Sequence, residues 1–91
     1  MTRVDQGTPM MKPTIHLNGT SKQCLIDGYF DVVCALQAAT GKVAEHAPNA
    51  RDYYPQGPEA YTIARAEHQS RLDRLWAIER EITEILEAIC E

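Results

Sequence analysis

The chain has 91 residues and a formal net charge of −4 at pH 7, and its 9 basic residues are scattered along it. A chain of this length forms one domain, whose core is marginal unless the remaining apolar surface is buried against another copy. Scattered basic residues form no positive stripe that neutralises phosphates, so we expect no binding to duplex nucleic acid. We therefore expect one small domain that associates with itself.

Three cysteines, Cys24, Cys34 and Cys90, occur at spacings that fit no metal site. Their odd number favours free, buried thiols over a disulfide framework, and hence a reducing compartment. The sequence contains no apolar run of the length of a membrane span and no recognisable cleaved leader. These features predict a soluble cytoplasmic protein that does not insert into a membrane.

Residues 1–13 are polar and show no periodicity, and they include Met10 and Met11, either of which can be the true start. We expect this leader to be disordered. Residues 14–91 are then the single folded domain, a helical hairpin whose helices are described next.

The domain begins with residues 14–17, which suit a short extended segment, followed by a turn at Asn18-Gly19. Thr20 and Gln23 have the spacing of a capping box, in which the threonine side chain caps the first turn of a helix. This pattern predicts that Thr20 is the helix cap.

Apolar residues recur at three- and four-residue steps from about Ser21 to about Ala47, which predicts the first helix. The stripe consists of Leu25, Tyr29, Val32, Val33, Leu36, Ala39, Val43 and Ala47. Gly28 and Gly41 interrupt this helix at a cost of about 1 kcal/mol each relative to alanine. We interpret them as points of close helix contact or of bending. Pro48 ends the helix.

The second helix is predicted from about Pro58, a residue suited to a first helical turn, to about Ile89. Its stripe consists of Tyr61, Ala64, His68, Leu72, Leu75, Ile78, Ile82, Ile85, Leu86 and Ile89. The short connection predicts an all-α, antiparallel two-helix hairpin. Ile63 and Trp76 lie off the stripe and indicate a second apolar face. We interpret this face as an intersubunit contact in an oligomeric helical bundle; scattered exposed residues are the alternative.

The connection "PNARDYYPQGPEAY" carries more aromatic and charged residues than a link between helices needs. Tyr53 and Tyr54 offer flat faces for stacking, Arg51 offers a planar fork for phosphate or carboxylate, and Gln56 offers an amide. This combination suits a nucleotide-like ligand. The alternative is structural: Arg51 and Asp52 pair with each other while the tyrosines plug the end of the bundle.

The stretch "HLNGTSK" at the start of the first helix offers free N–H groups and hydroxyls to an anion. Ordinary capping is the alternative. His46, Arg65 and His68 flank the loop end of the hairpin. The residues that we predict to bind ligand are Asn18, Thr20, Ser21, Arg51, Asp52, Tyr53, Tyr54, Gln56, Arg65 and His68.

The two ligand-binding stretches lie at opposite ends of an antiparallel hairpin, about 40 Å apart by helix rise. One chain cannot join them, whereas two antiparallel chains can. We therefore expect pockets shared between subunits, each built from the Asn18 turn of one chain and the Arg51 loop of another.

"HLNGTS" and "NARDYYPQGPEA", together with the charged, Ile/Leu-rich final helix, resemble a group of small phage and prophage proteins of unassigned function. The resemblance covers residues 14–91, and its two loop motifs are more specific than its helices. Such phage proteins often counter host defence, and some are oligomeric sponges that hold cyclic nucleotide signals without cleaving them. The resemblance implies sequestration of a signalling molecule in the host cytoplasm, and it assigns no site residue.

Evidence for an enzyme is weak, because the sequence has no phosphate-cradling glycine loop and no paired metal-ligand motif. A hydrolytic centre built from His46, Asp52 and His68 is the enzymatic alternative. We expect no catalysis, no metal and no cofactor. A further alternative is a protein-binding inhibitor of a host defence complex, which would need exposed aromatic residues spread over a face.

Overall fold

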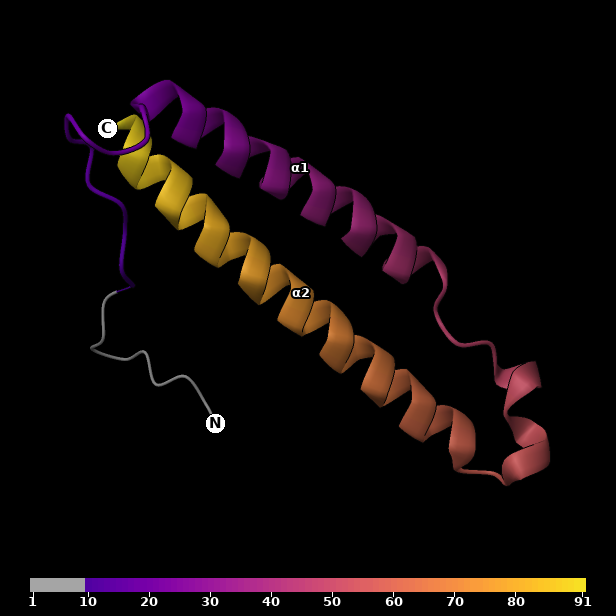
Figure 1. Cartoon of the computed structure of the whole chain (residues 1–91). Helices are drawn as coiled ribbons and strands as arrows, with labels where there is room; N and C mark the ends of the chain where they lie inside the picture. The colour runs from indigo at the N-terminus through magenta and orange to yellow at the C-terminus, as the bar shows by residue number, and fades with distance from the viewer. Residues whose placement is uncertain (1–9) are drawn as a thin grey trace.

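The computed structural model describes residues 10–91, so the leader prediction for residues 1–9 lies outside the described residues. The elements are α1 (Lys22–Glu45), the short 3₁₀ turns η1 (Ala50–Asp52) and η2 (Tyr54–Gln56), and α2 (Ala60–Cys90). The two helices pack side by side and antiparallel, and the 3₁₀ turns form the far end of the hairpin (Figure 1). The described residues contain no β-strand. The predicted all-α hairpin is confirmed.

The segment before α1 has no regular secondary structure until a turn at Leu17 and Asn18. The Gly19 N–H donates to the His16 carbonyl at 3.1 Å and closes this turn. The imidazole of His16 covers Gly19 so closely that an added Cβ would lie 2.7 Å from its Nε2. Glycine at position 19 thus lets the ring fold back over the turn.

The cap of α1 is Ser21, and the prediction that Thr20 is the cap is wrong by one residue. Ser21 has extended backbone angles, and its Oγ accepts a 3.1 Å hydrogen bond from the Cys24 N–H. The predicted partner Gln23 instead donates from Nε2 to Asp27 Oδ1 at 2.8 Å, one turn further along the helix. Both Thr20 and Ser21 have side chains that favour the cap position, so local sequence did not separate them.

The helix ends differ from the predicted ones by one or two residues. α1 ends at Glu45, and the N–H of His46 donates to the Val43 carbonyl at 3.1 Å, so Ala47 lies outside the helix. Pro58 lies in the turn before α2, whose first residue is Ala60. Differences of this size are usual because helix ends fray and tighten.

The contact between the helices is narrow. Among the described residues the buried apolar side chains are Val33, Leu72 and Ile89, and the buried polar one is Thr40. Ile78 belonged to the predicted stripe, but it is 46 % exposed and lies at the edge of the contact between the helices. An apolar stripe with a period of 3.6 residues rotates slowly around the helix relative to the line along which two packed helices touch. Successive members of the stripe therefore move out of the contact.

The same drift applies on α1. Val32 is 42 % exposed and Ala39 is exposed, so neither lies in the contact between the helices. Thr40, by contrast, is buried, at 5 % exposure. The predicted stripe is wrong at Val32, Ala39 and Ile78. Thr40 is absent from the predicted stripe, and threonine is among the residues that are mostly exposed in proteins.

Neither Gly28 nor Gly41 lies in close contact with other atoms. A Cβ added at either position would meet nothing within 4 Å, and α1 continues through both residues without interruption. The interpretation of close contact within the hairpin is therefore wrong for both glycines. Any close approach at these positions would have to come from another molecule.

The three thiols are free, as predicted, but Cys24, Cys34 and Cys90 are all exposed, so the predicted burial is wrong. Two packed helices offer only one narrow seam, and none of these three positions falls on it. No helix in residues 10–91 has the length and hydropathy that crossing a membrane requires.

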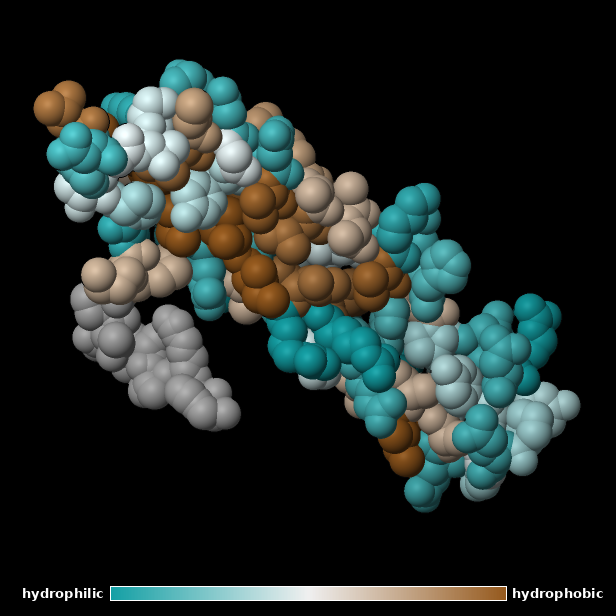
Figure 2. Space-filling model, in the orientation of Figure 1, coloured by the Kyte–Doolittle hydropathy of each residue, from teal (hydrophilic) through white to brown (hydrophobic). Residues whose placement is uncertain are grey.

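Much apolar surface is left uncovered. No large side chain is fully buried in the described residues, and Phe30, Ile63 and Trp76 are about half exposed, at 55 %, 55 % and 47 %. Figure 2 shows hydrophobic side chains gathered along the face that α1 and α2 share, while the loop end is mostly hydrophilic. The second apolar face predicted from Ile63 and Trp76 is thus exposed in the single chain.

Candidate functional site

The connection between the helices is an ordered loop. Asn49 begins it, and its Oδ1 accepts a 3.0 Å hydrogen bond from the Arg51 N–H. Two backbone hydrogen bonds close η1, from Asp52 N–H to the Asn49 carbonyl at 2.9 Å and from Tyr53 N–H to the Ala50 carbonyl at 3.1 Å. The side chain of Asn49 thus imitates a backbone turn, as asparagine commonly does.

The second half of the loop repeats this pattern. Gln56 N–H donates to the Tyr53 carbonyl at 2.9 Å, and Gly57 N–H donates to the Tyr54 carbonyl at 3.1 Å. Gly57 then turns the chain into α2 with φ of +124°, a conformation that a residue with a Cβ rarely adopts. Consecutive closed turns fix the backbone that carries the candidate ligand-binding side chains.

The side chains of this loop point mainly to solvent. Tyr54 is 72 % exposed, Arg51, Asp52 and Gln56 are exposed, and Tyr53 is half-buried. Within residues 10–91 no ion pair joins Arg51 and Asp52. In the structural alternative the charges pair locally and both tyrosines fill the end of the bundle. Of these features, the described residues show only the partial burial of Tyr53.

Two adjacent shallow hollows lie where the loop meets α2, and we call them together the loop-end hollow. Its lining residues are Tyr53, Gln56, Gly57, Pro58, Glu59, Ala60, Ile63, Ala64 and Glu67. Gln56, Ala60 and Ile63 line both parts. The floor is apolar, and the charged side chains in the lining are the carboxylates of Glu59 and Glu67.

The two flanking candidates on α2 have different surroundings. The guanidinium carbon of Arg65 lies 5.9 Å from the centre of the Tyr61 ring, a cation–π contact on the helix surface. His68 is half-buried, and its Nε2 is buried without a hydrogen-bond partner in the described chain. Arg65 is thus exposed close to the loop, whereas the ring of His68 reaches into the protein.

The other candidate segment, His16–Ser21, lies at the opposite end of the hairpin. Its Asn18 and Thr20 side chains are exposed, while the Ser21 hydroxyl is engaged in capping. Lys22 Nζ lies 3.4 Å from the backbone carbonyl oxygen of Glu91, which fixes the start of α1 beside the end of α2. The structure therefore brings Arg51, Asp52, Tyr53, Tyr54 and Gln56 together on one loop and keeps Asn18, Thr20 and Ser21 away from them (Figure 1).

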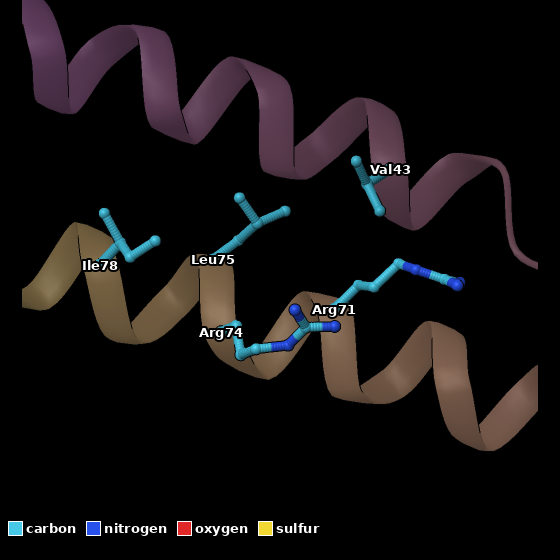
Figure 3. A pocket seen from close by; sticks show the side chains of 5 residues that line it. All are labelled: Val43, Arg71, Arg74, Leu75 and Ile78. Carbon is cyan, nitrogen blue, oxygen red and sulfur yellow. The ribbon is translucent and has the colours of Figure 1, made fainter. Parts of the chain in front are cut away.

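A third hollow lies halfway along the hairpin. Val43 of α1 points toward α2, Leu75 and Ile78 of α2 point toward α1, and the arginines Arg71 and Arg74 extend beside them (Figure 3). Arg74 Nε donates to the Ser70 carbonyl at 3.3 Å, and Arg71 lies 3.9 Å from Glu67. This hollow is apolar with a basic edge. Sequence analysis did not select it, because Arg71 and Arg74 looked like ordinary surface residues of a helix.

The residues proposed for a hydrolytic centre are not linked by hydrogen bonds in the described chain. His46 Nδ1 lies 3.3 Å from the Lys42 carbonyl on its own helix, Asp52 is exposed on the loop, and His68 has the surroundings given above. Within residues 10–91 no cluster of three or more His, Cys, Asp or Glu side chains is placed to hold a metal ion.

Comparison with known proteins gives no relative: no family model, no curated protein and no solved structure matches this chain.

Sequence analysis missed Asn49 and the acidic lining of the loop-end hollow, Glu59 and Glu67. For Asn49 a signal was present, since an asparagine two residues before a loop residue often accepts its N–H. A signal was present for the two carboxylates as well, since Glu59, Ile63 and Glu67 recur at four-residue steps and so share one face of the predicted second helix.

Proposed function

We propose that this protein binds and sequesters a small nucleotide-like signalling molecule, without chemical change, in pockets that two copies of the chain build together. The observation that carries the proposal is the loop at Arg51–Gln56, a backbone held by closed turns that displays Tyr54 at 72 % exposure and the guanidinium of Arg51, which has no partner among residues 10–91. A backbone held by closed turns loses little further entropy on binding a ligand, so only the exposed side chains have to be ordered.

Each group in the loop fits one part of a nucleotide. Tyr54 offers a face on which a base can stack, a contact worth about 1–3 kcal/mol per base. Arg51 offers a guanidinium to a phosphate, and Gln56 offers an amide to a base edge or a ribose hydroxyl. Arg65, although it lies over Tyr61, remains on the surface near the loop and can supply a second cation.

The remaining part of the pocket is assigned to a second copy. Asn18 and Thr20 are exposed in the turn before α1 and have no side-chain hydrogen bond in the described chain. They supply an amide and a hydroxyl at the opposite end of the hairpin from the loop. An antiparallel arrangement of two chains brings the two segments together and makes symmetry-related pockets.

In its cellular setting, the proposed role is that of a phage-type anti-defence protein acting in the host cytoplasm. Sequestration requires affinity and abundance, and it requires neither a nucleophile nor a metal. The two sequence motifs that resemble small phage proteins are the two segments that form the proposed pocket. We accordingly assign it no cofactor.

The direct test is native mass spectrometry of the purified protein with a panel of linear and cyclic mono-, di- and trinucleotides. We expect intact ligand bound to an oligomer, and the same ligand recovered unchanged after denaturation. Recovery of a cleaved nucleotide would show an enzyme. Failure of every nucleotide to bind an assembled oligomer would contradict the proposal.

A second candidate function, inhibition of a host defence complex by direct protein binding, is favoured by one observation. Phe30 and Trp76, on different helices, are about half exposed at 55 % and 47 %, and large aromatic residues are common anchors in protein interfaces. Substituting both by serine should abolish binding to such a partner while leaving nucleotide binding intact. A parent protein that binds nucleotide and binds no defence protein would favour sequestration.

A further inference from the structure

The turn before α1 carries an unusually exposed apolar side chain. Leu17 is 96 % exposed, and Ile15, two residues before it, is 45 % exposed. The turn is closed by the hydrogen bond from Gly19 N–H to the His16 carbonyl, so Leu17 is held at the tip of a defined structure. We call residues 12–22 the basic turn, because its charged side chains are Lys12 and Lys22, without an acidic residue among them.

The loop-end hollow has the complementary character. Ile63, at 55 % exposure, forms part of its floor together with Ala60 and Ala64. The charged residues of its lining are both acidic, Glu59 and Glu67, and Glu67 lies 3.9 Å from Arg71 on the exposed surface of α2. The hollow thus combines an apolar floor with a negative edge, and the basic turn combines an apolar tip with positive flanks.

The two features cannot meet within one chain. They lie at opposite ends of the hairpin (Figure 1), and Ile63 is separated from the end of α2 by about 40 Å of helix at 1.5 Å per residue. Leu17 lies only a few residues before Lys22, whose side chain contacts Glu91, and five extended residues span no more than about 18 Å. The occupant of the hollow must therefore come from another molecule.

We infer that the basic turn of one copy docks into the loop-end hollow of a second copy, with Leu17 against Ile63 and with Lys12 facing Glu59 and Glu67. The contact removes from water two of the most exposed apolar side chains of the described chain, and opposite charges set the orientation. It does not depend on any ligand, so it stands or falls separately from nucleotide binding. In an antiparallel pair of chains this docking contact occurs twice.

The first test is photo-crosslinking of the full-length protein without ligand, with a benzophenone amino acid in place of Leu17. Isotope-labelled and unlabelled chains are mixed, so that crosslinks between copies are distinguished from crosslinks within one chain. We expect crosslinks between copies in the peptide that contains Ile63. Crosslinks confined to one chain, crosslinks mapped elsewhere on a second copy, or no crosslinked dimer would each overturn the inference.

The second test measures self-association by sedimentation. Leu17→Asp and Ile63→Asp should each weaken it about 10- to 100-fold, the scale of burying one large aliphatic side chain. The matched control is Met11→Asp, a change at another highly exposed apolar residue, 88 % exposed, outside the basic turn. An equal loss in the control, or no loss in the two test variants, would contradict the docking.

A charge-exchange experiment tests the orientation. One chain carries Glu59→Lys and Glu67→Lys, and the other carries Lys12→Glu. Each variant alone should self-associate more weakly than the parent protein, whereas their mixture should recover association, because each turn then faces a hollow of opposite charge. Circular dichroism confirms that both variants remain helical. Absence of recovery between folded variants would overturn the proposed charge pairing.

Discussion

Gln37 Nε2 donates a 3.1 Å hydrogen bond to Glu79 Oε2 and so joins α1 to α2 across the hairpin. Glu79 lies between Leu75 and Ile82 on the helix and is half-buried, a position where sequence periodicity alone suggests an apolar residue. The carboxylate is accommodated because the amide of Gln37 reaches it. This polar contact fixes one relative position of two helices whose apolar contact is narrow.

The first prediction is that Gln37→Ala lowers the free energy of unfolding by about 0.5–1.5 kcal/mol, the usual net value of such a hydrogen bond. The matched control is Gln69→Ala, which removes a 3.0 Å bond to Asp73 within α2 alone. That control should cost about 0.2–0.5 kcal/mol, as for other pairs on one helix. Urea unfolding of both variants checks this, and equal costs would show that the contact across the hairpin has no special role.

The second prediction concerns Thr40, whose side chain is 5 % exposed and whose Oγ1 is buried without a hydrogen-bond partner in the part of the chain that the structure describes. Thr40→Val keeps the shape and removes the unpaired hydroxyl, so we expect stability to rise by about 1–2 kcal/mol. Thr40→Ala removes the buried methyl group as well and should gain less. Thermal unfolding at equal protein concentration makes the comparison, and a loss of stability in the valine variant would show that the hydroxyl is satisfied in solution.

The third prediction separates Ser21 from Thr20. Ser21→Ala removes the side chain that accepts from Cys24 N–H, so it should cost about 1 kcal/mol of stability. Thr20→Ala should change stability by no more than about 0.5 kcal/mol, as is usual for an exposed residue. If Thr20 belongs to the proposed pocket, its alanine variant should nevertheless bind nucleotide more weakly. Chemical denaturation and ligand titration of the same two samples decide both points.

The fourth prediction uses the two glycines of α1 as a matched pair. Gly41→Ala should stabilise the protein by about 0.5–1 kcal/mol, because a Cβ there meets nothing within 4 Å and the helix gains propensity. Gly28 is equally open within the chain, but it lines an apolar hollow with Leu25, Tyr29 and Val32. If a second copy packs on this hollow, Gly28→Ala should weaken self-association while Gly41→Ala leaves it unchanged. Analytical ultracentrifugation of both variants is the measurement.

The fifth prediction tests the shared pocket. Arg51→Ala and Tyr54→Ala alter exposed loop residues, so both should shift stability by no more than about 0.5 kcal/mol. Each should weaken nucleotide binding by about 1–3 kcal/mol through loss of the phosphate contact or the stacking ring. Calorimetric titration checks the binding, and unfolding of either variant would mean that the loop is a structural plug.

Its control is a mixture of two defective chains, one with Arg51→Ala and one with Asn18→Ala. In a pocket shared between copies some sites receive both intact halves, so partial binding should return after subunits exchange. A mixture that exchanges subunits and recovers no binding would place Arg51 and Asn18 in separate roles.

Sequence periodicity was sufficient for the two helices and for the residues at the centre of their contact. Val33, Leu72 and Ile89 belong to apolar stripes at three- and four-residue steps, and they are buried. Proline and glycine near the ends of these stripes placed the loop, because neither residue continues a helix well. The exposure of Ile63 and Trp76 also followed from sequence periodicity, since both residues lie off the apolar stripe.

The edge of the contact did not follow from periodicity. Val32, Ala39 and Ile78 share the apolar character of the stripe yet are exposed, while Thr40 is buried. Which residues enter the seam depends on how the two helices are rotated against each other, and that rotation is a property of the pair. The choice of Ser21 over Thr20 as cap depends likewise on where the backbone turns at Gly19.

For the candidate site, the sequence by itself determined which chemical groups are present: two tyrosines, an arginine and a glutamine in one loop, and an amide and hydroxyls in the turn before α1. Only the tertiary structure decided that Tyr54 projects into water while Tyr53 is half-buried, and that Tyr53 and Gln56 of the loop line the same hollow as Ile63 of α2. The physical reason is that residue type fixes what a side chain can bond to. Its exposure and its neighbours are fixed by the turns η1 and η2 and by the packing of the loop on α2.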